Sequence, residues 1–360
     1  MEAVPRKVTA LAAKPGEVSR LNSTHRVNIA EVAATAGVSV GTVSRVLNES
    51  PNVREHTRRR VTEVMKRLNY RPSRLAESLS RGQTRTVVIL VPFLTRPSVT
   101  ERLAGAISVL DDEGFDTVVR NVETPAQRDR HLAALTTRHE ADGAVVVSLR
   151  LNSEHLAALR SVPLAMVDTE APGVPCTVVD DIRGGSLATE HLISLGHHRI
   201  GFVGDSPDEF GFVSTRRRLL GYRRTLSRHR IEYDPAIVRL GRHSASVAAT
   251  MAQELLGLPA PPTAIFAGSD TQALGVLAAA EKSGHSVPAD LSVIGYDDIE
   301  SAALLGLSTI HQPLTESGAR GARRLCALIR GQLVRPLREE LPLSVVARTS
   351  SAMYAVAGVA

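Results

Sequence analysis

The sequence of 360 residues contains no tryptophan and only two cysteines, Cys176 and Cys326. Two cysteines exclude a disulfide framework and are typical of a protein that folds in a reducing compartment. No apolar run approaches the roughly 18 residues that a membrane span requires. The spacings of histidine, cysteine and carboxylate residues that mark metal sites are also missing, so we expect neither a metal nor a cofactor.

The positive charge is concentrated near the amino terminus. The formal net charge is +6, and residues 25–84 alone carry 11 lysines and arginines against 5 acidic residues. Residues 1–24, which we interpret as a disordered tail, contribute +2, and the rest of the chain sums to −2. A basic segment on a slightly acidic body indicates a nucleic-acid-binding domain. A solvated charged helix would have the same charge, so the charge alone leaves both interpretations open.

The first periodic part of the chain is expected to form three short helices, over 29–36, 40–47 and 55–68. Gly37 can adopt the positive φ of a tight turn between the first two helices, and Ser39 is a good N-cap for the second. A helix-turn-helix needs a small residue in its first helix and core-facing apolar residues in its second. Ala33 meets the first requirement, and Val43 and Val46 meet the second.

Beyond Gly82, short β-branched runs alternate with amphipathic segments. The runs expected to form buried parallel strands are TVVILV (86–91), FDTVV (115–119), DGAVVV (142–147), RIGFVG (199–204), TAIFA (263–267) and LSVIG (291–295). Helices are expected near 100–113, 125–139, 184–195, 215–229, 246–257 and 270–283. This alternation predicts a doubly wound α/β fold, and its length favours two subdomains. Ligands of such folds bind beyond the carboxyl ends of the strands.

The segment NIAEVAATAGVSVGTVSRVLNESPNVREHTRRRVTEVMKRLNYRPSRLAESL (28–79) resembles the DNA-binding head and hinge of LacI/GalR-type transcriptional regulators. The similarity continues in HLISLGHHRIGFVG (191–204), STRRRLLGY (214–222), AIFAGSDTQALGVL (264–277), LSVIGYDDIE (291–300), STIHQPL (308–314) and VVARTS (345–350). The resemblance implies an N-terminal three-helix helix-turn-helix head and a hinge helix. A two-subdomain doubly wound α/β core, similar to periplasmic binding proteins, would follow.

The expected organisation has five parts: a disordered tail (1–24), the head (25–70), the hinge helix and linker (71–84), the effector-binding and dimerisation core (85–350) and a C-terminal tail (351–360). The resemblance implies a cytoplasmic, nucleoid-associated homodimer that binds pseudo-palindromic double-stranded operator DNA. It also implies a small-molecule effector, a carbohydrate or related metabolite. We expect no membrane contact and no enzymatic activity. A tetramer stays open, although the tail after Ser351 is too short for a long tetramerising helix.

Several residues in the head are candidates for DNA contacts, because a recognition helix presents its first turns to base edges in the major groove. Arg45 can bond guanine through two hydrogen bonds, and Val40 can touch a thymine methyl group. Thr42, Asn48 and Thr57 suit phosphate contacts, with capping or solvent exposure as the alternative for both threonines. The candidate DNA-binding residues are Ser39, Val40, Gly41, Thr42, Ser44, Arg45, Asn48, Thr57, Ser73, Ala76 and Leu79.

Residues 73–80 (SRLAESLS) are the hinge by resemblance. Eight residues are too few for a stable isolated helix, so we expect the hinge to order on DNA. In the family, a leucine at the position of Leu79 inserts into the minor groove, and two such leucines from a dimer kink the central step. Ala76 is small enough for close approach to the groove. Without the resemblance, Leu79 would be interpreted as a linker residue that packs on the body.

The candidate effector-binding residues lie mostly at the ends of expected strands. Arg218 matches the family's arginine before a glycine–aromatic pair, where it would bond ligand hydroxyls or an acid group. Asp297 follows the strand LSVIG, and a carboxylate there suits paired sugar hydroxyls. Asp270 opens a helix and has an N-cap role as its alternative. The candidate effector-binding residues are Arg218, Asp297, Asp270, Ser269, Asp168 and Gln312.

One stretch departs from the family pattern. Relatives often carry aromatic residues after the first strand of the body, where this chain has Thr95-Arg96-Pro97-Ser98-Val99. The chain holds only six phenylalanines and five tyrosines, so we expect fewer aromatic contacts to a sugar than in a conventional carbohydrate pocket. Arg96 indicates an anionic or more polar effector, or else it is a solvent-exposed loop arginine.

Two other classes of function stay open. A solute-binding protein would share the body, but the basic head and the expected lack of a signal peptide argue against it. An enzyme with a doubly wound fold would need a cofactor or catalytic motif, and GFVGDS (201–206) lacks the full GxGxxG pattern. The sequence favours a transcription factor, most often a repressor, in which an effector changes subdomain closure and thereby operator affinity.

Overall fold

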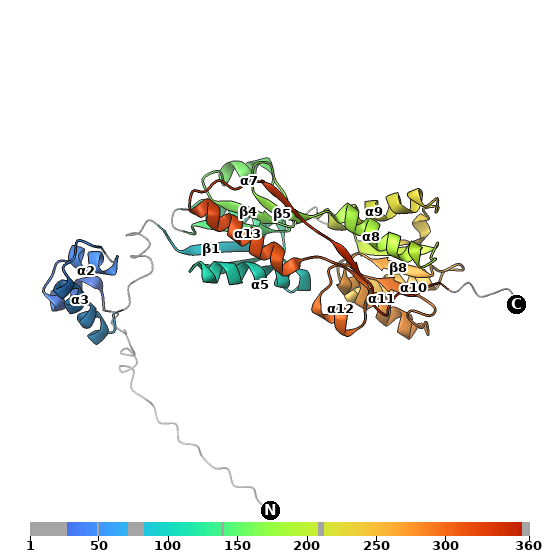
Figure 1. Ribbon diagram of the computed structural model, residues 1–360, viewed down its shortest axis with the longest axis horizontal. Coiled ribbons are helices and arrows are strands. Elements are labelled where there is room, and N and C mark those ends of the chain that lie inside the picture. Colours follow the sequence, from blue (N-terminus) through green and yellow to red (C-terminus); the bar gives the residue numbers. More distant parts are fainter. Residues whose placement is uncertain (1–26, 49, 71–82, 138–139, 208–211, 355–360) are drawn as a thin grey trace, which may run out of the picture. The chain divides into compact units, whose positions relative to one another are not determined.

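The computed structural model describes residues 27–48, 50–70, 83–137, 140–207 and 212–354. The chain divides into two compact units, Met1–Gly82 and Gln83–Ala360, which we call the head and the body (Figure 1). The predicted tail and the predicted hinge residues lie outside the described ranges: 1–24, Ser73, Ala76 and Leu79. In the described ranges, no helix is long and apolar enough to cross a membrane.

The head contains three helices: α1 (Ile29–Ala36), α2 (Val40–Leu47) and α3 (Glu55–Arg67). Local signals set their ends. The Asn28 side chain caps α1, and Gly37 ends it with a φ of 62°. The Ser39 Oγ caps α2 by accepting a hydrogen bond from the Thr42 backbone N–H at 3.2 Å. The first two helices therefore have the expected bounds, and α3 ends one residue earlier than expected.

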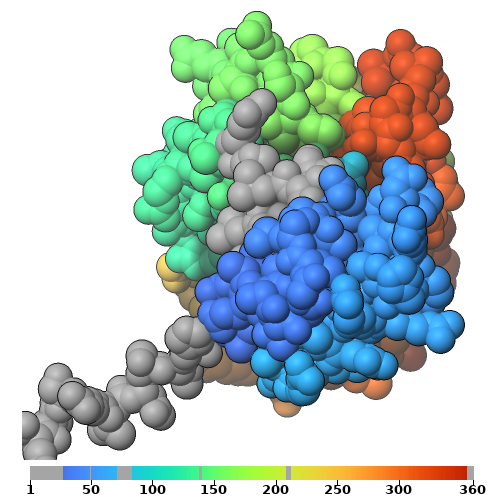
Figure 2. Space-filling model, turned by 90° about the vertical axis from the view of Figure 1, so that its left-hand side faces the viewer, coloured from blue at the N-terminus to red at the C-terminus, as the bar shows by residue number. Residues whose placement is uncertain are grey.

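One small apolar core joins the three helices of the head. Its buried residues are Val32, Ala33, Ala36, Val43, Val46, Val61 and Val64. This core confirms the helix-turn-helix, with a small residue in α1 and two core-facing valines in α2. Figure 2 shows the outer surface of these helices in blue.

The first subdomain of the body is built on a parallel six-stranded sheet of order β11-β5-β4-β3-β1-β2. The strands are β1 (Thr86–Pro92), β2 (Asp116–Val122), β3 (Gly143–Val147), β4 (Leu164–Val167), β5 (Cys176–Val179) and β11 (Arg338–Leu341). One face packs against α5 (Pro97–Asp112) and α13 (Leu314–Ile329). The other face packs against α6 (Pro125–Leu135) and against Leu159, which directly follows α7 (Ser153–Ala158). Because both faces are covered, the central strands are continuous apolar runs.

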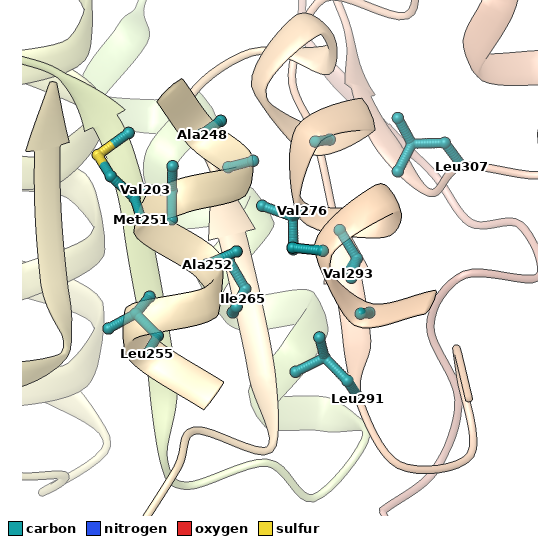
Figure 3. Packing of buried hydrophobic residues seen from close by; sticks show 14 of the residues in the cluster. Val203, Ala248, Met251, Ala252, Leu255, Ile265, Val276, Leu291, Val293 and Leu307 are labelled. Carbon is teal, nitrogen blue, oxygen red and sulfur yellow. The ribbon is translucent and has the colours of Figure 1, made fainter. Parts of the chain in front are cut away.

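The second subdomain has a parallel four-stranded sheet of order β7-β6-β8-β9 and a separate antiparallel pair, β10-β12. The strands are β6 (Ile200–Asp205), β7 (Val238–Gly241), β8 (Ala264–Ala267), β9 (Ser292–Ile294), β10 (Thr309–His311) and β12 (Ser344–Val346). The helices are α8 (Asp181–Ser194), α9 (Ser214–Arg228), α10 (Ala245–Leu256), α11 (Asp270–Lys282) and α12 (Glu300–Leu304), with a 3₁₀ turn at Pro235–Ile237. Helices α8 and α9 pack on one face of the sheet, and α10 and α11 pack on the other. In Figure 3, Met251 and Leu255 of α10 and Val276 of α11 lie near Val203 and Ile265 of the sheet.

The chain passes between the two subdomains three times, at 179–181, 311–314 and 341–344. The second crossover leads into α13, which packs tightly against α5. A Cβ added at Gly105 would collide with the Thr315 carbonyl, and one added at Gly318 would collide with the Arg102 carbonyl. This close approach brings the middle of α5 to the subdomain junction. Helix α13 was not among the helices expected from the sequence.

Candidate functional sites

The recognition helix α2 has one buried face and one exposed face. Val43 and Val46 are buried in the core of the head. On the opposite side, Ser39, Gly41 and Arg45 are exposed, and Val40 is 44% exposed. Thr42 and Ser44 are half-buried. The residues predicted to face base edges therefore share one solvent-exposed surface, and Arg45 is its long charged side chain.

The predicted phosphate contacts are residues at helix ends. Thr42 Oγ1 lies 3.0 Å from Ser39 Oγ, next to the cap of α2. Asn48 is the C-cap residue of α2, and Thr57 lies in the first turn of α3 with its Oγ1 3.2 Å from His56 Nε2. The structure thus gives Thr42 a place beside a helix cap, which was its alternative role. The exposed helix ends still present these groups at the surface, where phosphate contacts are commonly made.

A cleft lies between the two subdomains of the body, near the carboxyl ends of strands from both sheets. The space within it, together with the open solvent at its mouth, is about 540 Å³. Its lining residues are Pro92, Arg96, Ser98, Val99, Arg102, Ser148, Asp168, Asp205, Phe212, Ser214, Arg218, His243, Ser269, Asp297 and Gln312. The cleft therefore brings together every predicted effector-binding residue except Asp270.

Arg218 extends from α9 to the cleft and is almost fully buried. Its Nε donates to Asp181 Oδ1 at 2.9 Å, its Nη1 donates to the Gly268 carbonyl at 2.6 Å, and its Cζ lies 3.6 Å from the centre of the Tyr296 ring. Burial alone would lower the pKa of Arg218, but Asp181, Tyr296, Asp297 and Asp168 together outweigh it and hold that pKa above its usual range. The guanidinium is therefore permanently charged and fixed in orientation.

A chain of polar contacts joins two predicted effector residues through a residue that was not predicted. Asp168 Oδ1 lies 3.0 Å from Nη2 of Arg102, and the same nitrogen donates to Gln312 Oε1 at 3.0 Å. Gln312 Nε2 donates to Asp297 Oδ1 at 2.6 Å. Ser148 Oγ donates to the second Asp168 oxygen at 2.6 Å. Five cleft residues are thus connected in series by three hydrogen bonds and one ion pair.

The two predicted carboxylates of the cleft, Asp168 and Asp297, are on unusual backbone. Asp168 has a φ of 57° and Asp297 a φ of 121°, and Asp298 follows with a φ of 63°. Non-glycine residues in this region carry strain and concentrate at binding sites. Burial also raises the pKa of Asp297, because the low-polarity surroundings disfavour its charged form. The next residue, Asp298, forms an ion pair with Arg348, with 2.6 Å between Asp298 Oδ1 and Arg348 Nη2.

Asp270 is the predicted effector residue that does not border the cleft. It is fully buried and accepts hydrogen bonds from Thr309 Oγ1 at 2.6 Å and from the Ile299 backbone N–H at 3.0 Å. These contacts brace α11 against the loop after β9. Its alternative role as the N-cap is wrong, because Ser269 caps α11 by accepting from the Gln272 N–H at 3.2 Å. Burial, and next the Asp297 charge, raise the pKa of Asp270 to about 8.

One aromatic residue, Phe212, lines the cleft, and a second, Phe93, packs against it, although the sequence predicted few aromatic contacts. Phe93 follows β1, and Phe212 precedes α9 from the other subdomain; their ring centres are 6.3 Å apart. The Arg96 Cζ lies 4.3 Å from the centre of the Phe93 ring and 5.6 Å from that of Phe212. Arg96 is thus a half-buried cleft residue, and its interpretation as a solvent-exposed loop arginine is wrong. Neither ring lies in the stretch 95–99 that was compared with the family.

A histidine–aspartate pair also lines the cleft without having been predicted. His243 Nδ1 lies 3.1 Å from Asp205 Oδ1, and Gln272 Nε2 donates to the same carboxylate oxygen at 2.9 Å. Burial alone would raise the pKa of Asp205, but the contact with His243 lowers it below its usual range. The position of Asp205 at the end of β6 was the signal available in the sequence, since ligand groups follow strand ends.

Comparison with known proteins matches both units. Residues 28–73 match the model of the family described as bacterial regulatory proteins, lacI family, and residues 189–351 match a periplasmic binding protein-like domain. The chain is 33% identical to the HTH-type transcriptional repressor PurR of Aliivibrio salmonicida (strain LFI1238), over 81% of this chain and 88% of that protein. It is 34% identical to the ribose operon repressor of Escherichia coli (strain K12), over 80% of this chain and 88% of the repressor.

Solved structures agree with this relationship. The lac repressor dimer bound to operator and the anti-inducer ONPF superimposes with a TM-score of 0.80 and 31% identity, covering 91% of this chain and 99% of that one. The complex of the transcriptional regulator CelR with cellobiose has a TM-score of 0.67 and 30% identity, covering 91% of this chain and 100% of that one. Together with the helix-turn-helix head and the two-subdomain body, these matches show that the chain belongs to the LacI family of bacterial regulatory proteins and is a DNA-binding transcriptional regulator.

Proposed function

We propose that this regulator is a homodimeric repressor of a pseudo-palindromic operator, controlled by a carbohydrate or related metabolite in the cleft. The observation that carries the proposal is the combination, in one chain, of an exposed polar recognition face and a cleft lined by five of the six predicted effector residues. A solute-binding protein has no use for a recognition helix. The protein acts by binding and not by catalysis, and it works on the chromosome in the cytoplasm.

In the proposed DNA complex, residues 25–70 form the reading head. Arg45 bonds a guanine and Val40 contacts a thymine methyl group, whereas Gly41 allows the helix to approach the groove closely. The remaining head contacts, from Ser39, Thr42, Ser44, Asn48 and Thr57, go to phosphates or to neighbouring bases. Residues 71–84 act as the hinge and linker, with Ser73, Ala76 and Leu79 at the minor groove.

In the proposed effector complex, residues 85–350 form the binding core. Arg218, Asp168 and Asp297 face the ligand with charged groups, and Ser269 and Gln312 add neutral hydrogen-bonding groups. Carboxylate and guanidinium groups that line one cleft suit a ligand rich in hydroxyls, because each group can bond two neighbouring oxygens. The similarity to a ribose operon repressor and to a cellobiose-bound regulator supports a sugar. Asp270 braces the site from behind.

Duplex binding tests the first half of the proposal. The full-length chain would first select its operator from a pool of randomised duplexes, and fluorescence anisotropy would then measure affinity at several salt concentrations. We expect the logarithm of the binding constant to fall linearly with that of the salt concentration, because phosphate contacts release counterions. Negligible, salt-insensitive binding to every duplex would overturn the proposal.

A ligand screen tests the second half. Thermal unfolding would be followed with a panel of pentoses, hexoses, disaccharides and nucleosides, first without and then with operator DNA. A true effector raises the unfolding temperature and changes operator affinity, because a ligand that binds one state better shifts the equilibrium toward it. A ligand that stabilises the protein without changing operator affinity would contradict its role as effector.

A further inference from the structure

Arg102 lies at the junction of the two subdomains, although no sequence motif marks it. The residue is 4% exposed and comes from α5, where it contacts Asp168 and Gln312 through one terminal nitrogen. Gln312 continues the contact to Asp297. We call this series of contacts, Asp168–Arg102–Gln312–Asp297, the Arg102 bridge. It connects the two carboxylates that the proposed function assigns to the effector.

The Arg102 bridge spans the region where the subdomains must move relative to each other. Asp168 follows β4 in the first subdomain, and Asp297 follows β9 in the second. Gln312 lies between them, in the crossover from β10 to α13. The bonds of the bridge are 2.6–3.0 Å long, and hydrogen bonds weaken steeply when stretched beyond about 3.5 Å. A rotation of one subdomain against the other would therefore break the bridge.

The hydrogen bonding around Arg102 is incomplete. Two buried polar atoms, Arg102 Nε and Thr177 Oγ1, have no hydrogen-bond partner among the described residues. Both residues border the same tightly packed contact with Asp168, Gln312 and Ser317, which leaves no space for a water molecule. Buried polar groups without partners are costly, so an arrangement that satisfies them competes with the one observed. The junction therefore has the character of a two-state element.

We infer that Arg102 is a positioning residue that couples the effector to subdomain rotation. The Arg102 bridge holds the Asp168 and Asp297 carboxylates at a fixed separation. An effector that bonds these carboxylates takes over their hydrogen bonds, releases the guanidinium and frees the subdomains to rotate. The inference rests on the proposed function, because it takes Asp168 and Asp297 as effector contacts.

A double-mutant cycle on the full-length chain tests the inference. The variants Arg102→Met, Gln312→Met and the double variant each remove the bridge, and the readout is affinity for the selected operator duplex without added sugar. We expect both single variants to change that affinity by about fivefold in the same direction, the scale of an allosteric coupling. The double variant should change it no further, because one bridge is lost in all three. Additive effects, or unchanged affinity in both single variants, would overturn the inference.

Two controls separate this role from a merely structural one. Arg239→Met removes a comparable guanidinium, which pairs with Glu254 at 2.7 Å on the edge strand β7, and should leave operator affinity unchanged. Arg102→Lys keeps a charge beside Asp168 but loses the fork that reaches Gln312, so its effect should be intermediate. If Arg102→Met fails to fold, the lysine variant and Gln312→Met still decide the matter. The bridge would be refuted if Arg102→Lys bound the operator with wild-type affinity while Gln312→Met bound it with a changed affinity.

Amide hydrogen exchange gives a readout that does not depend on DNA. The three crossovers at 179–181, 311–314 and 341–344 should exchange faster in Arg102→Met and Gln312→Met than in the wild type and in Arg239→Met, because the junction opens more often. Equal exchange in all four proteins would contradict the inference. If the wild-type chain binds no duplex, but the crossovers still exchange faster in Arg102→Met and Gln312→Met, the proposed function is overturned and the bridge stands.

Discussion

Arg218 and Asp181 form a buried ion pair between α9 and α8, with 2.9 Å between Nε and Oδ1. The stacking of the same guanidinium on Tyr296 fixes its plane. A lysine offers neither a planar fork nor a stacking surface. We therefore expect Arg218→Lys to weaken effector binding by at least about tenfold, roughly 1.4 kcal/mol, while the effector-free protein still binds its operator.

Titration calorimetry with the sugar that most raises the unfolding temperature would measure this loss. Arg216→Lys is the matched control, because Arg216 is an exposed neighbour on the same helix. Equal affinities in the two variants would remove Arg218 from the effector site. A loss of operator binding in Arg218→Lys without effector would instead indicate that the ion pair stabilises the body as a whole.

Arg45 is expected to read one base in each half-site. Replacing it with alanine removes the bidentate contact, so discrimination at that position should fall by about 1–3 kcal/mol. Operators selected by Arg45→Ala from a randomised pool should have lost one preferred base pair per half-site. Arg59→Ala is the control, because Arg59 is an exposed residue of α3 that pairs with Glu55. A base preference identical to that of the wild type would refute the role of Arg45.

The contact between α5 and α13 depends on glycine. A Cβ at Gly105 would meet the Thr315 carbonyl of α13, which is backbone and cannot rotate away. Gly105→Ala should therefore destabilise the body by about 1–3 kcal/mol, despite the better helix propensity of alanine. Urea unfolding would measure the change, with Ser108→Ala on the exposed face of α5 as control. A Gly105→Ala protein as stable as the wild type would show that the helices can separate at little cost.

The head was predictable because its signals are local. The caps at Asn28 and Ser39 and the left-handed Gly37 lie within a few residues of the helix ends that they define. The strands β1, β2, β3, β6, β8 and β9 were predicted for the same reason, since each contains a short apolar run, but the buried strand β5 was not. Helix α13 was missed although apolar residues recur along it at helical spacing. Its contact with α5 could not be predicted, because the glycines that allow it fit only against a helix distant in the sequence.

The cleft was only partly predictable, since strand ends mark where ligand groups lie but not what contacts them. Asp168 and Asp297 follow strands and were found in this way. Arg102 stands within a helix, and its partner Gln312 is 210 residues away in the sequence. Phe212 reaches the cleft from the second subdomain, so its pairing with Phe93 depends on tertiary structure. Asp270 was wrongly predicted to border the cleft. A residue that follows a strand can also point into the protein interior, and the Asp270 side chain does so.

The buried Asp270 carboxyl should make stability depend on pH. Its pKa is about 8 in the folded protein, against an ordinary value of 3.8. Between these values the folded protein retains a proton that the unfolded chain has lost, so the unfolded state binds fewer protons. Stability contributed by this group is therefore fully present below about pH 4 and falls as the pH rises toward about 8.

Asp270→Asn tests this origin of the pH dependence, because an amide resembles the protonated carboxyl and does not titrate. We expect the unfolding temperature of the wild type to fall between pH 5 and pH 8, and that of Asp270→Asn to fall less. Differential scanning calorimetry at three pH values would measure both slopes. Asp112→Asn, at the exposed end of α5, should keep the wild-type slope. If Asp270→Asn also keeps that slope, Asp270 is charged in the folded protein and the fall has another source, because a retained proton would disappear with the carboxyl.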